Sequence, residues 1–194
     1  MKKKILVKGP VLSQSGYGEQ ARFALRALRS REDIFDIYIQ PIRWGNTGWV
    51  WEHSEERDWI DSMITKTALY TREGGQVDMS LQITIPNEWE RLAPINIGYT
   101  AGIETTKVAP EWLYKGNQMD KIIVVSDHSK NVFKNTVAVG QDQTGQQREF
   151  ALETPIESVG YAVRHHEAEE IPGFDPTPAF NFLCVSQWGP RKNF

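Results

Sequence analysis

The sequence predicts an α/β protein with a mostly parallel β-sheet and helices on both of its faces. Short apolar segments of strand length alternate along the chain with segments of helical period. Glycine, proline or a serine suited to helix capping stands between most of them. Such alternation is typical of a parallel sheet that is covered on both faces.

The composition is that of a globular protein and excludes several classes of function. The chain has 194 residues, 40% of them apolar and 24% charged, with a net charge of −3. Lysine and arginine are scattered, which disfavours nucleic acid as the main partner. The single cysteine, Cys184, rules out an internal disulfide. No apolar run has the ~18 residues of a membrane span, and Lys8 interrupts the first one too early for a signal peptide, so we expect a cytoplasmic protein.

The first strand and helix are expected within the first thirty residues. Residues 5–7 are apolar and are followed by Gly9 and Pro10, which predicts a short buried strand and then a loop at residues 10–18. The next segment has apolar residues at helical spacing, namely Ala21, Ala24, Leu25 and Leu28. Three arginines are expected on the opposite side of this helix, namely Arg22, Arg26 and Arg29.

A second strand and a long helix follow. Residues 35–39 alternate in polarity and predict a strand. Ser54 is expected to cap a long helix, which Gly74 and Gly75 end. The buried stripe of that helix consists of Trp59, Ile60, Met63 and Ile64.

The rest of the chain predicts further strands and two short helices. One helix opens at Pro110 and the other is capped by Ser126. The polar segment 141–147 suits an exposed hairpin or loop. The strands are expected at residues 77–85, 95–99, 122–125, 155–163 and 180–185.

Three prolines between residues 171 and 178 indicate a linker between domains. We therefore expect one domain at residues 1–172. Residues 173–194 are expected to hold a linker and the first strand of a truncated second domain. That last strand has no helix after it to cover it, so self-association through residues 180–185 is expected.

The loop before the first helix is a candidate phosphate site. It contains Gly16, Tyr17 and Gly18, and backbone N–H groups at the start of a helix bind anions well. The other interpretation is a tight turn that needs a positive φ at Gly16 or Gly18. The spacing matches neither the dinucleotide-binding nor the P-loop motif, which argues against a dehydrogenase or a P-loop NTPase.

A second candidate loop, residues 98–107, directly follows a strand and therefore faces the crevice at the carboxyl edge of the sheet. Its carboxylate, Glu104, is suited to accept a hydroxyl proton or to hold a sugar hydroxyl. The alternative is a solvated loop glutamate.

Aromatic and histidine clusters predict less. Trp44, Trp49 and Trp51 crowd one loop, and packing is the expected role of most tryptophans. His165 and His166 are adjacent, so in a strand they point to opposite faces and do not chelate a metal together. No metal site is predicted.

Four segments occur in an order known from one protein family: VKGPVLSQSGYGEQARFALRAL, INIGYTAGIETTKVAPEWLYKGNQMDKIIVVSDHSKNVF, TPIESVGYAV and FNFLCVSQWGPRKNF. In this order they resemble the retaining glycosyltransferases of the GT-B fold, close to glycosyltransferase family 4. The resemblance implies two Rossmann-like domains facing each other across a cleft. The front domain mainly holds the acceptor and the rear domain mainly holds the nucleotide sugar.

The resemblance also implies roles for individual residues. Gly16 and Gly18 match the glycine-rich loop that approaches the donor's diphosphate and sugar. Glu104 lies where the family often has a near-catalytic histidine. Arg191 and Lys192 match a basic pair that stabilises the departing diphosphate. The family's donor motif, E-x7-E, lies far into the rear domain, past Phe194, so the chain is expected to be inactive by itself.

The expected function is transfer of a sugar from a nucleotide-diphosphate sugar to an unidentified acceptor, a saccharide or a lipid, with no other cofactor. One alternative is a non-catalytic Rossmann-like module that binds a ligand or a protein. A second is another GT-B enzyme, a sugar-nucleotide epimerase.

Overall fold

The computed structural model describes residues 2–141, 146–163, 165–167, 169–175 and 177–185. The chain divides into two compact units, Met1–Ala162 and Val163–Phe194. All helices and strands that the structure describes belong to the first unit. None of these helices is both long enough and apolar enough to cross a lipid bilayer.

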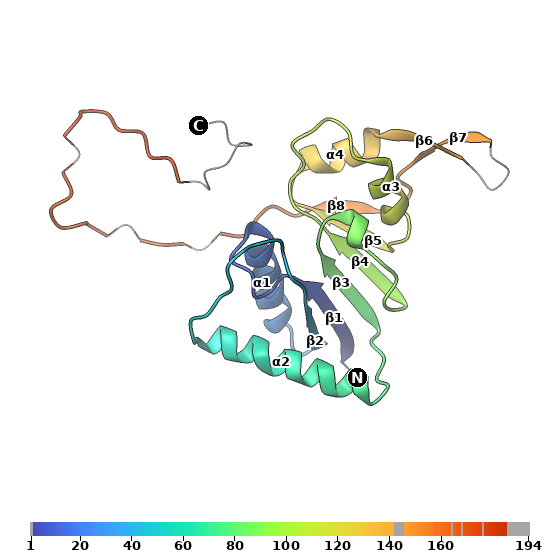
Figure 1. Cartoon of the computed structure of the whole chain (residues 1–194), viewed down its shortest axis with the longest axis horizontal. Coiled ribbons are helices and arrows are strands. Elements are labelled where there is room, and N and C mark those ends of the chain that lie inside the picture. Colours follow the sequence, from blue (N-terminus) through green and yellow to red (C-terminus); the bar gives the residue numbers. More distant parts are fainter. Residues whose placement is uncertain (1, 142–145, 164, 168, 176, 186–194) are drawn as a thin grey trace. The chain divides into compact units, whose positions relative to one another are not determined.

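The first unit contains a six-stranded sheet whose neighbouring strands are all parallel (Figure 1). The strand order is β2-β1-β3-β4-β5-β8. The strands are β1 (Lys3–Gly9), β2 (Phe35–Pro41), β3 (Met79–Ile83), β4 (Ile95–Tyr99), β5 (Lys121–Val124) and β8 (Ile156–Ser158). The predicted α/β fold with a parallel sheet is confirmed, and it is consistent with a Rossmann-like fold.

Helices connect the strands and begin at polar caps. They are α1 (Gly16–Arg29), α2 (Glu55–Arg72), the short 3-10 helix η1 (Pro86–Glu88), α3 (Pro110–Gly116) and α4 (Asp127–Asn135). Ser54 and Ser126 cap α2 and α4 through hydrogen bonds from backbone N–H groups three residues on, as predicted. Ser15 does the same for α1, which therefore starts earlier than the sequence pattern indicated.

The core consists of two clusters on opposite faces of the sheet. Strand register places Val7, Leu81 and Tyr99 on one face, which we call the α1 face because Ala21 and Leu25 of α1 pack there. Gly98 and Ile122 lie on the other face, the α4 face, where Phe133 of α4 packs with residues of α3. The first cluster centres on β1, β2 and β3, and the second on β5 and β8.

The segment after β3 folds back over the α4 face. Trp89 is fully buried, and a Cβ at Gly98 would lie 2.6 Å from its ring, so only glycine fits there. Gln82 fixes the segment through two hydrogen bonds with the backbone of Glu90, at 2.6 and 3.0 Å. Satisfied buried polar groups of this kind define one packing arrangement.

Helix α2 lies along the outer edge of β2 and satisfies part of its backbone. Thr67 accepts a hydrogen bond from the N–H of Ile39 at 2.7 Å, and Lys66 donates to the carbonyl of Ile37 at 3.0 Å. An edge strand covered in this way is not available for pairing with another chain.

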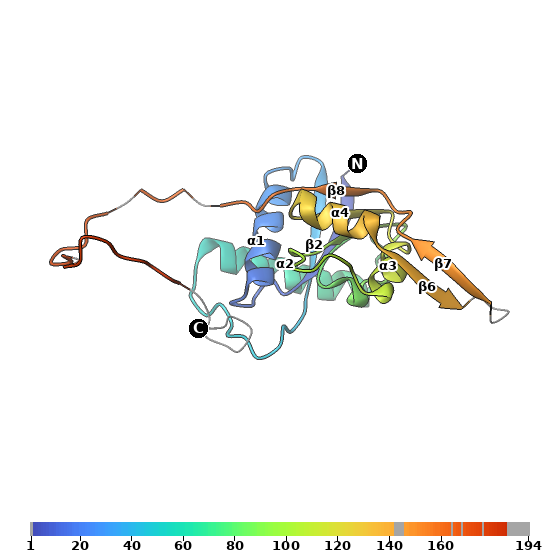
Figure 2. The same cartoon turned by 90° about the horizontal axis from the view of Figure 1, so that it is seen from above.

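A two-stranded antiparallel hairpin, β6 (Val137–Gln141) and β7 (Gln147–Ala151), projects from the sheet and helices in both views (Figures 1 and 2). Residues 141–147, for which a hairpin or a loop was expected, lie at the connection between these two strands, and residues 142–145 lie outside the described part. Val137 and Val139 are exposed on the hairpin.

Two strand predictions were wrong: one strand is shorter than expected, and the other does not form. The segment at residues 155–163 forms only the short strand β8, because the last backbone hydrogen bond to β5 is donated by Val159 and the residues after it leave the sheet. Residues 180–185 form no strand in the described part of the chain, and Phe182 and Leu183 there are about nine-tenths exposed. Apolar content alone predicted that strand, and the described residues show no neighbouring strand for it to pair with.

Candidate functional site

The loop before α1 and the loop after β4 meet at the carboxyl edge of the sheet. The Tyr17 hydroxyl lies 2.8 Å from the Thr100 hydroxyl, and the backbone N–H of Ala101 donates to the Tyr17 oxygen at 3.1 Å. Thr100 directly follows β4 and is fully buried. One side chain therefore joins the first turn of α1 to the loop that carries Glu104.

The edge is also where the chain changes direction within the sheet. Strands β1 and β3 are neighbours, and the connection that leaves β1 runs to β2 on one side, whereas the connection that leaves β3 runs to β4 on the other. In open α/β sheets, ligands bind at such a switch point, outside the carboxyl ends of the strands. Thr84 follows β3 there, and its fully buried hydroxyl makes no hydrogen bond to any residue that the structure describes.

The first turn of α1 offers backbone donors. Ser15 accepts the N–H of Gly18 at 3.1 Å through its side chain and that of Glu19 at 2.9 Å through its carbonyl. The earlier N–H groups, those of Gly16 and Tyr17, donate to no acceptor in the described residues. The first N–H groups of a helix have no acceptor within the helix, and they lie at the positive end of its dipole. They can therefore donate to an anion outside the helix.

The two glycines of this turn have different surroundings. A Cβ at Gly18 would lie 2.0 Å from the carbonyl oxygen of Ser13, so the loop packs too closely for any other residue. A Cβ at Gly16 would meet open space. Neither glycine has a positive φ, so the interpretation of a turn that needs such a conformation is wrong.

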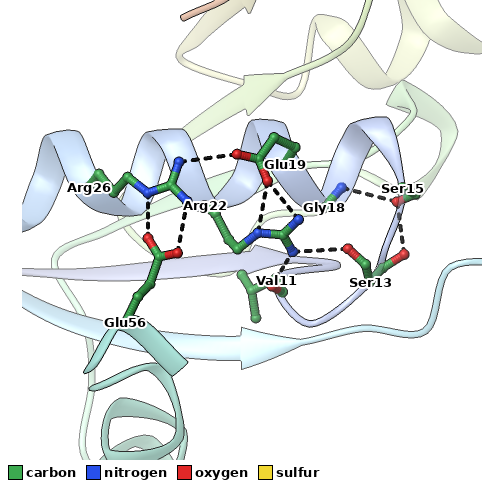
Figure 3. Close-up of polar contacts among 8 residues, drawn as sticks. All are labelled: Val11, Ser13, Ser15, Gly18, Glu19, Arg22, Arg26 and Glu56. Atoms are coloured by element: carbon green, nitrogen blue, oxygen red, sulfur yellow. Dashed lines mark hydrogen bonds and ion pairs between the residues drawn. The ribbon is translucent and has the colours of Figure 1, made fainter. Parts of the chain in front are cut away.

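Arg22 joins the loop after β1 to α1, as Figure 3 shows. One guanidinium nitrogen donates to the carbonyls of Val11 and Ser13, each at 2.9 Å, and Glu19 accepts from the others. The prediction that Arg22 lies on the outer side of α1 is therefore wrong, because these carbonyls bind its buried guanidinium. Arg26, in contrast, reaches Glu19 and Glu56 of α2 (Figure 3).

Burial and hydrogen bonding shift two ionisable groups near the loop. Burial raises the pKa of Tyr17 above its ordinary value of 10.0, although hydrogen bonds with Thr100 and Ala101 oppose it, so the hydroxyl stays protonated at neutral pH. Burial also acts to raise the pKa of Glu19, but hydrogen bonds from Arg22 and Arg26 lower it overall. The loop thus rests on a carboxylate that is ionised at neutral pH.

The loop after β4 is anchored by its backbone. The N–H of Gly102 donates to the Tyr161 hydroxyl at 3.3 Å, and that of Ile103 donates to Ser129 of α4 at 3.2 Å. Glu104 follows at once and is exposed. The loop therefore holds its carboxylate at the solvent-facing side of this edge.

The structure thus brings together some of the predicted residues. Gly16, Tyr17 and Gly18 share the edge with the loop of Glu104, whereas Arg191 and Lys192 lie outside the described residues. Sequence reasoning missed Thr100 and Tyr161. A hydroxyl residue at the end of a strand and a tyrosine just past β8 were the available signals.

Most of the tryptophans that the structure describes pack as predicted. Trp89 is fully buried, and Trp59 and Trp112 are partly buried against the two core clusters. Trp49 and Trp51 are exposed, at 38% and 77%. Among the described residues, no group of three histidine, cysteine, aspartate or glutamate side chains is placed to hold a metal ion.

Comparison with protein-family models, with curated proteins and with solved structures finds no match for this chain.

Proposed function

We propose that this chain is the acceptor-side domain of a glycosyltransferase that transfers a sugar from a nucleotide-diphosphate sugar to an acceptor. The observation that carries the proposal is the pair of hydrogen bonds at the Tyr17 hydroxyl, one shared with the Thr100 hydroxyl and one accepted from the N–H of Ala101. They join a turn with donor N–H groups to the loop of Glu104 at one edge. Phosphate-binding and hydroxyl-binding chemistry are both needed for this transfer.

In this proposal, each group has a defined role. The N–H groups of Gly16 and Tyr17 donate to diphosphate oxygens, and the open space at Gly16 admits them. Glu104 accepts a hydrogen bond from an acceptor hydroxyl and takes up its proton as the hydroxyl oxygen attacks the sugar. The expected basic pair, Arg191 and Lys192, would stabilise the departing diphosphate.

Titration with uridine and guanosine diphosphate sugars tests the donor side of the proposal. The 15N-labelled chain is followed by NMR, and the amide signals of Gly16 and Tyr17 are expected to shift most. Glu104→Gln is expected to leave these shifts unchanged, because Glu104 acts on the acceptor. The chain alone is expected to give no turnover.

The outcomes separate the proposal from its alternative. Shifts that saturate at Gly16 and Tyr17 with diphosphate sugars, and not with the free sugars, support it. Absence of shifts at these amides contradicts it. Shifts caused equally by unrelated anions would favour a non-catalytic ligand-binding module.

A further inference from the structure

A cavity lies beside the candidate site, in the loop after β2. It has a volume of about 240 Å³ and is formed where residues 42–49 pack against the loop after β1. Drug-sized ligands occupy pockets of about 300–1,000 Å³. A smaller ligand, one the size of a single sugar ring, therefore suits this cavity.

The cavity has a fixed frame. The backbone N–H of Gln14 donates to the carbonyl of Gly48 at 2.8 Å, and that of Val50 donates to Leu12 at 2.9 Å. Gly45, which lines the cavity, has a φ of +50°, a conformation that favours glycine. The ring of Trp44 lies 4.5 Å from that of Tyr17, which ties this loop to the candidate site.

The lining combines hydroxyl, amide and aromatic groups. Ser13 and Thr47 contribute hydroxyls that lie 2.6 Å apart, and Asn46 contributes an exposed amide. Trp44 and Trp49 contribute indole rings, and Trp49 is 38% exposed. Sugar rings have apolar faces that stack on indoles and hydroxyls that pair with such polar groups.

The charged side chain that lines the cavity is a cation. Arg43 lines the cavity and no carboxylate does. Within the described residues, its guanidinium forms no ion pair, unlike Arg22, Arg26, Arg29, Arg31 and Arg57. A guanidinium at the mouth of a hydroxyl-lined cavity recognises phosphate or carboxylate through paired hydrogen bonds.

We infer that the cavity between residues 42–49 and the loop after β1 binds a monosaccharide that carries an anionic group, with Arg43 on the anion and the indoles on the ring. The anion is a phosphate or a carboxylate, which the guanidinium recognises by the same chemistry. The inference concerns binding alone and does not depend on sugar transfer at the neighbouring edge.

Calorimetric titration of the whole chain with glucose 6-phosphate, glucuronate, glucose and inorganic phosphate tests the inference. At least one of the two anionic sugars is expected to bind at least about tenfold more tightly than glucose or phosphate, because ring and anion each contribute contacts. Arg43→Gln is expected to remove that advantage. Asn46→Ala is expected to weaken all sugars by a few-fold and to leave phosphate unchanged.

Controls make either result decisive. Arg31→Gln removes an exposed arginine that pairs with Asp33 between α1 and β2, and it should bind like the unmodified chain. Thermal unfolding should be unchanged in all three variants, since the three side chains are exposed. The inference is overturned if glucose binds as tightly as both anionic sugars, or if inorganic phosphate does. It is also overturned if Arg43→Gln leaves the binding of the anionic sugars unchanged, or if no ligand binds at about 10 mM.

Discussion

At the scale of single residues, two glycines separated by one tyrosine are glycine for different reasons. Gly18 packs against the carbonyl of Ser13, where no Cβ fits. Gly16 has an ordinary φ and open space beside it, so the described chain does not require glycine there. Glycine at position 16 is therefore not needed for packing or for backbone conformation. The lack of a side chain there would let a ligand approach the backbone closely.

Substitution of the two glycines by alanine separates these reasons. Gly18→Ala is expected to lower the free energy of unfolding by about 2 kcal/mol or more, because the new methyl group displaces the loop. Gly16→Ala is expected to change it by less than about 0.5 kcal/mol and to weaken binding of a diphosphate sugar. Urea unfolding and the NMR titration measure the two effects. A Gly16→Ala variant with unimpaired binding would argue against the proposed phosphate site.

Tyr17→Phe tests the link between the two loops. The substitution leaves the buried Thr100 hydroxyl without its partner and is expected to cost about 1–2 kcal/mol of stability. Phe23→Leu, on the same helix, is a control that removes no hydrogen bond. The measurement is urea unfolding at pH 7.

The same substitution has a pH-dependent consequence. The pKa of Tyr17 is raised by burial, so the folded state holds the phenolic proton more tightly than the unfolded state. The resulting stability is complete below the unfolded value of 10.0 and is lost as the pH rises above it. Tyr17→Phe should therefore lose stability less steeply above pH 10.0. Part of the alkaline loss should remain, because burial also raises the pKa of Tyr38, to about 12. Equal slopes in both proteins would contradict this account.

At the scale of elements, the connection between β1 and α1 depends on one buried arginine. Arg22→Met keeps an unbranched apolar stem but removes the guanidinium, which leaves the carbonyls of Val11 and Ser13 without their donor. We expect a loss of about 2–3 kcal/mol in the free energy of unfolding. Arg29→Met, which removes a surface ion pair with Glu55, should cost less than about 1 kcal/mol. Equal losses would contradict the anchoring role.

Elements with local signals could be predicted from the sequence. Helix α2 has a capping serine, a stripe of Ile60 and Met63 and a terminal glycine pair, and all of them act as predicted. Strands β2 and β4 were likewise found because each is an apolar segment between turn residues. Residues 180–185 had the same local pattern without a neighbouring strand in the described chain, which no local pattern reveals.

The candidate site could be predicted only in part. The carboxyl edge follows from the order of strands and helices, so the glycine turn and the Glu104 loop were expected there together. The contact of Tyr17 with Thr100 joins residues 83 positions apart, and it depends on how α1 packs across β3. Arg22 was misplaced for a related reason. Helical period assigns a side chain to a face, but the carbonyl acceptors of the loop before α1 decide whether the charged group of Arg22 is buried.

At the scale of the whole molecule, the two compact units differ in kind. The unit Met1–Ala162 holds both core clusters, whereas the described residues of Val163–Phe194 contain neither helix nor strand. Exposed apolar side chains in the second unit include Phe180, Phe182 and Leu183. Surface of this kind favours association with other chains.

Removal of residues 163–194 should therefore change assembly more than stability. We expect the full chain to self-associate at high concentration and the shortened chain to sediment as a monomer. The free energy of unfolding should differ by less than about 1 kcal/mol, because no core residue is lost. Sedimentation velocity and urea unfolding measure both quantities. A full chain that stays monomeric at every concentration contradicts the first expectation.

The hydrogen bond between Tyr17 and Thr100 links parts of the domain that belong to different core clusters. Helix α1 belongs to one cluster, while the loop after β4 is tied through Ser129 to α4, which belongs to the other. The parallel sheet joins the two halves through β3, β4 and β5, and this hydrogen bond adds a side-chain link at its carboxyl edge. A molecule bound across this edge holds both halves at once, so occupancy would make the domain unfold as one cooperative body and slow its exchange of amide hydrogens.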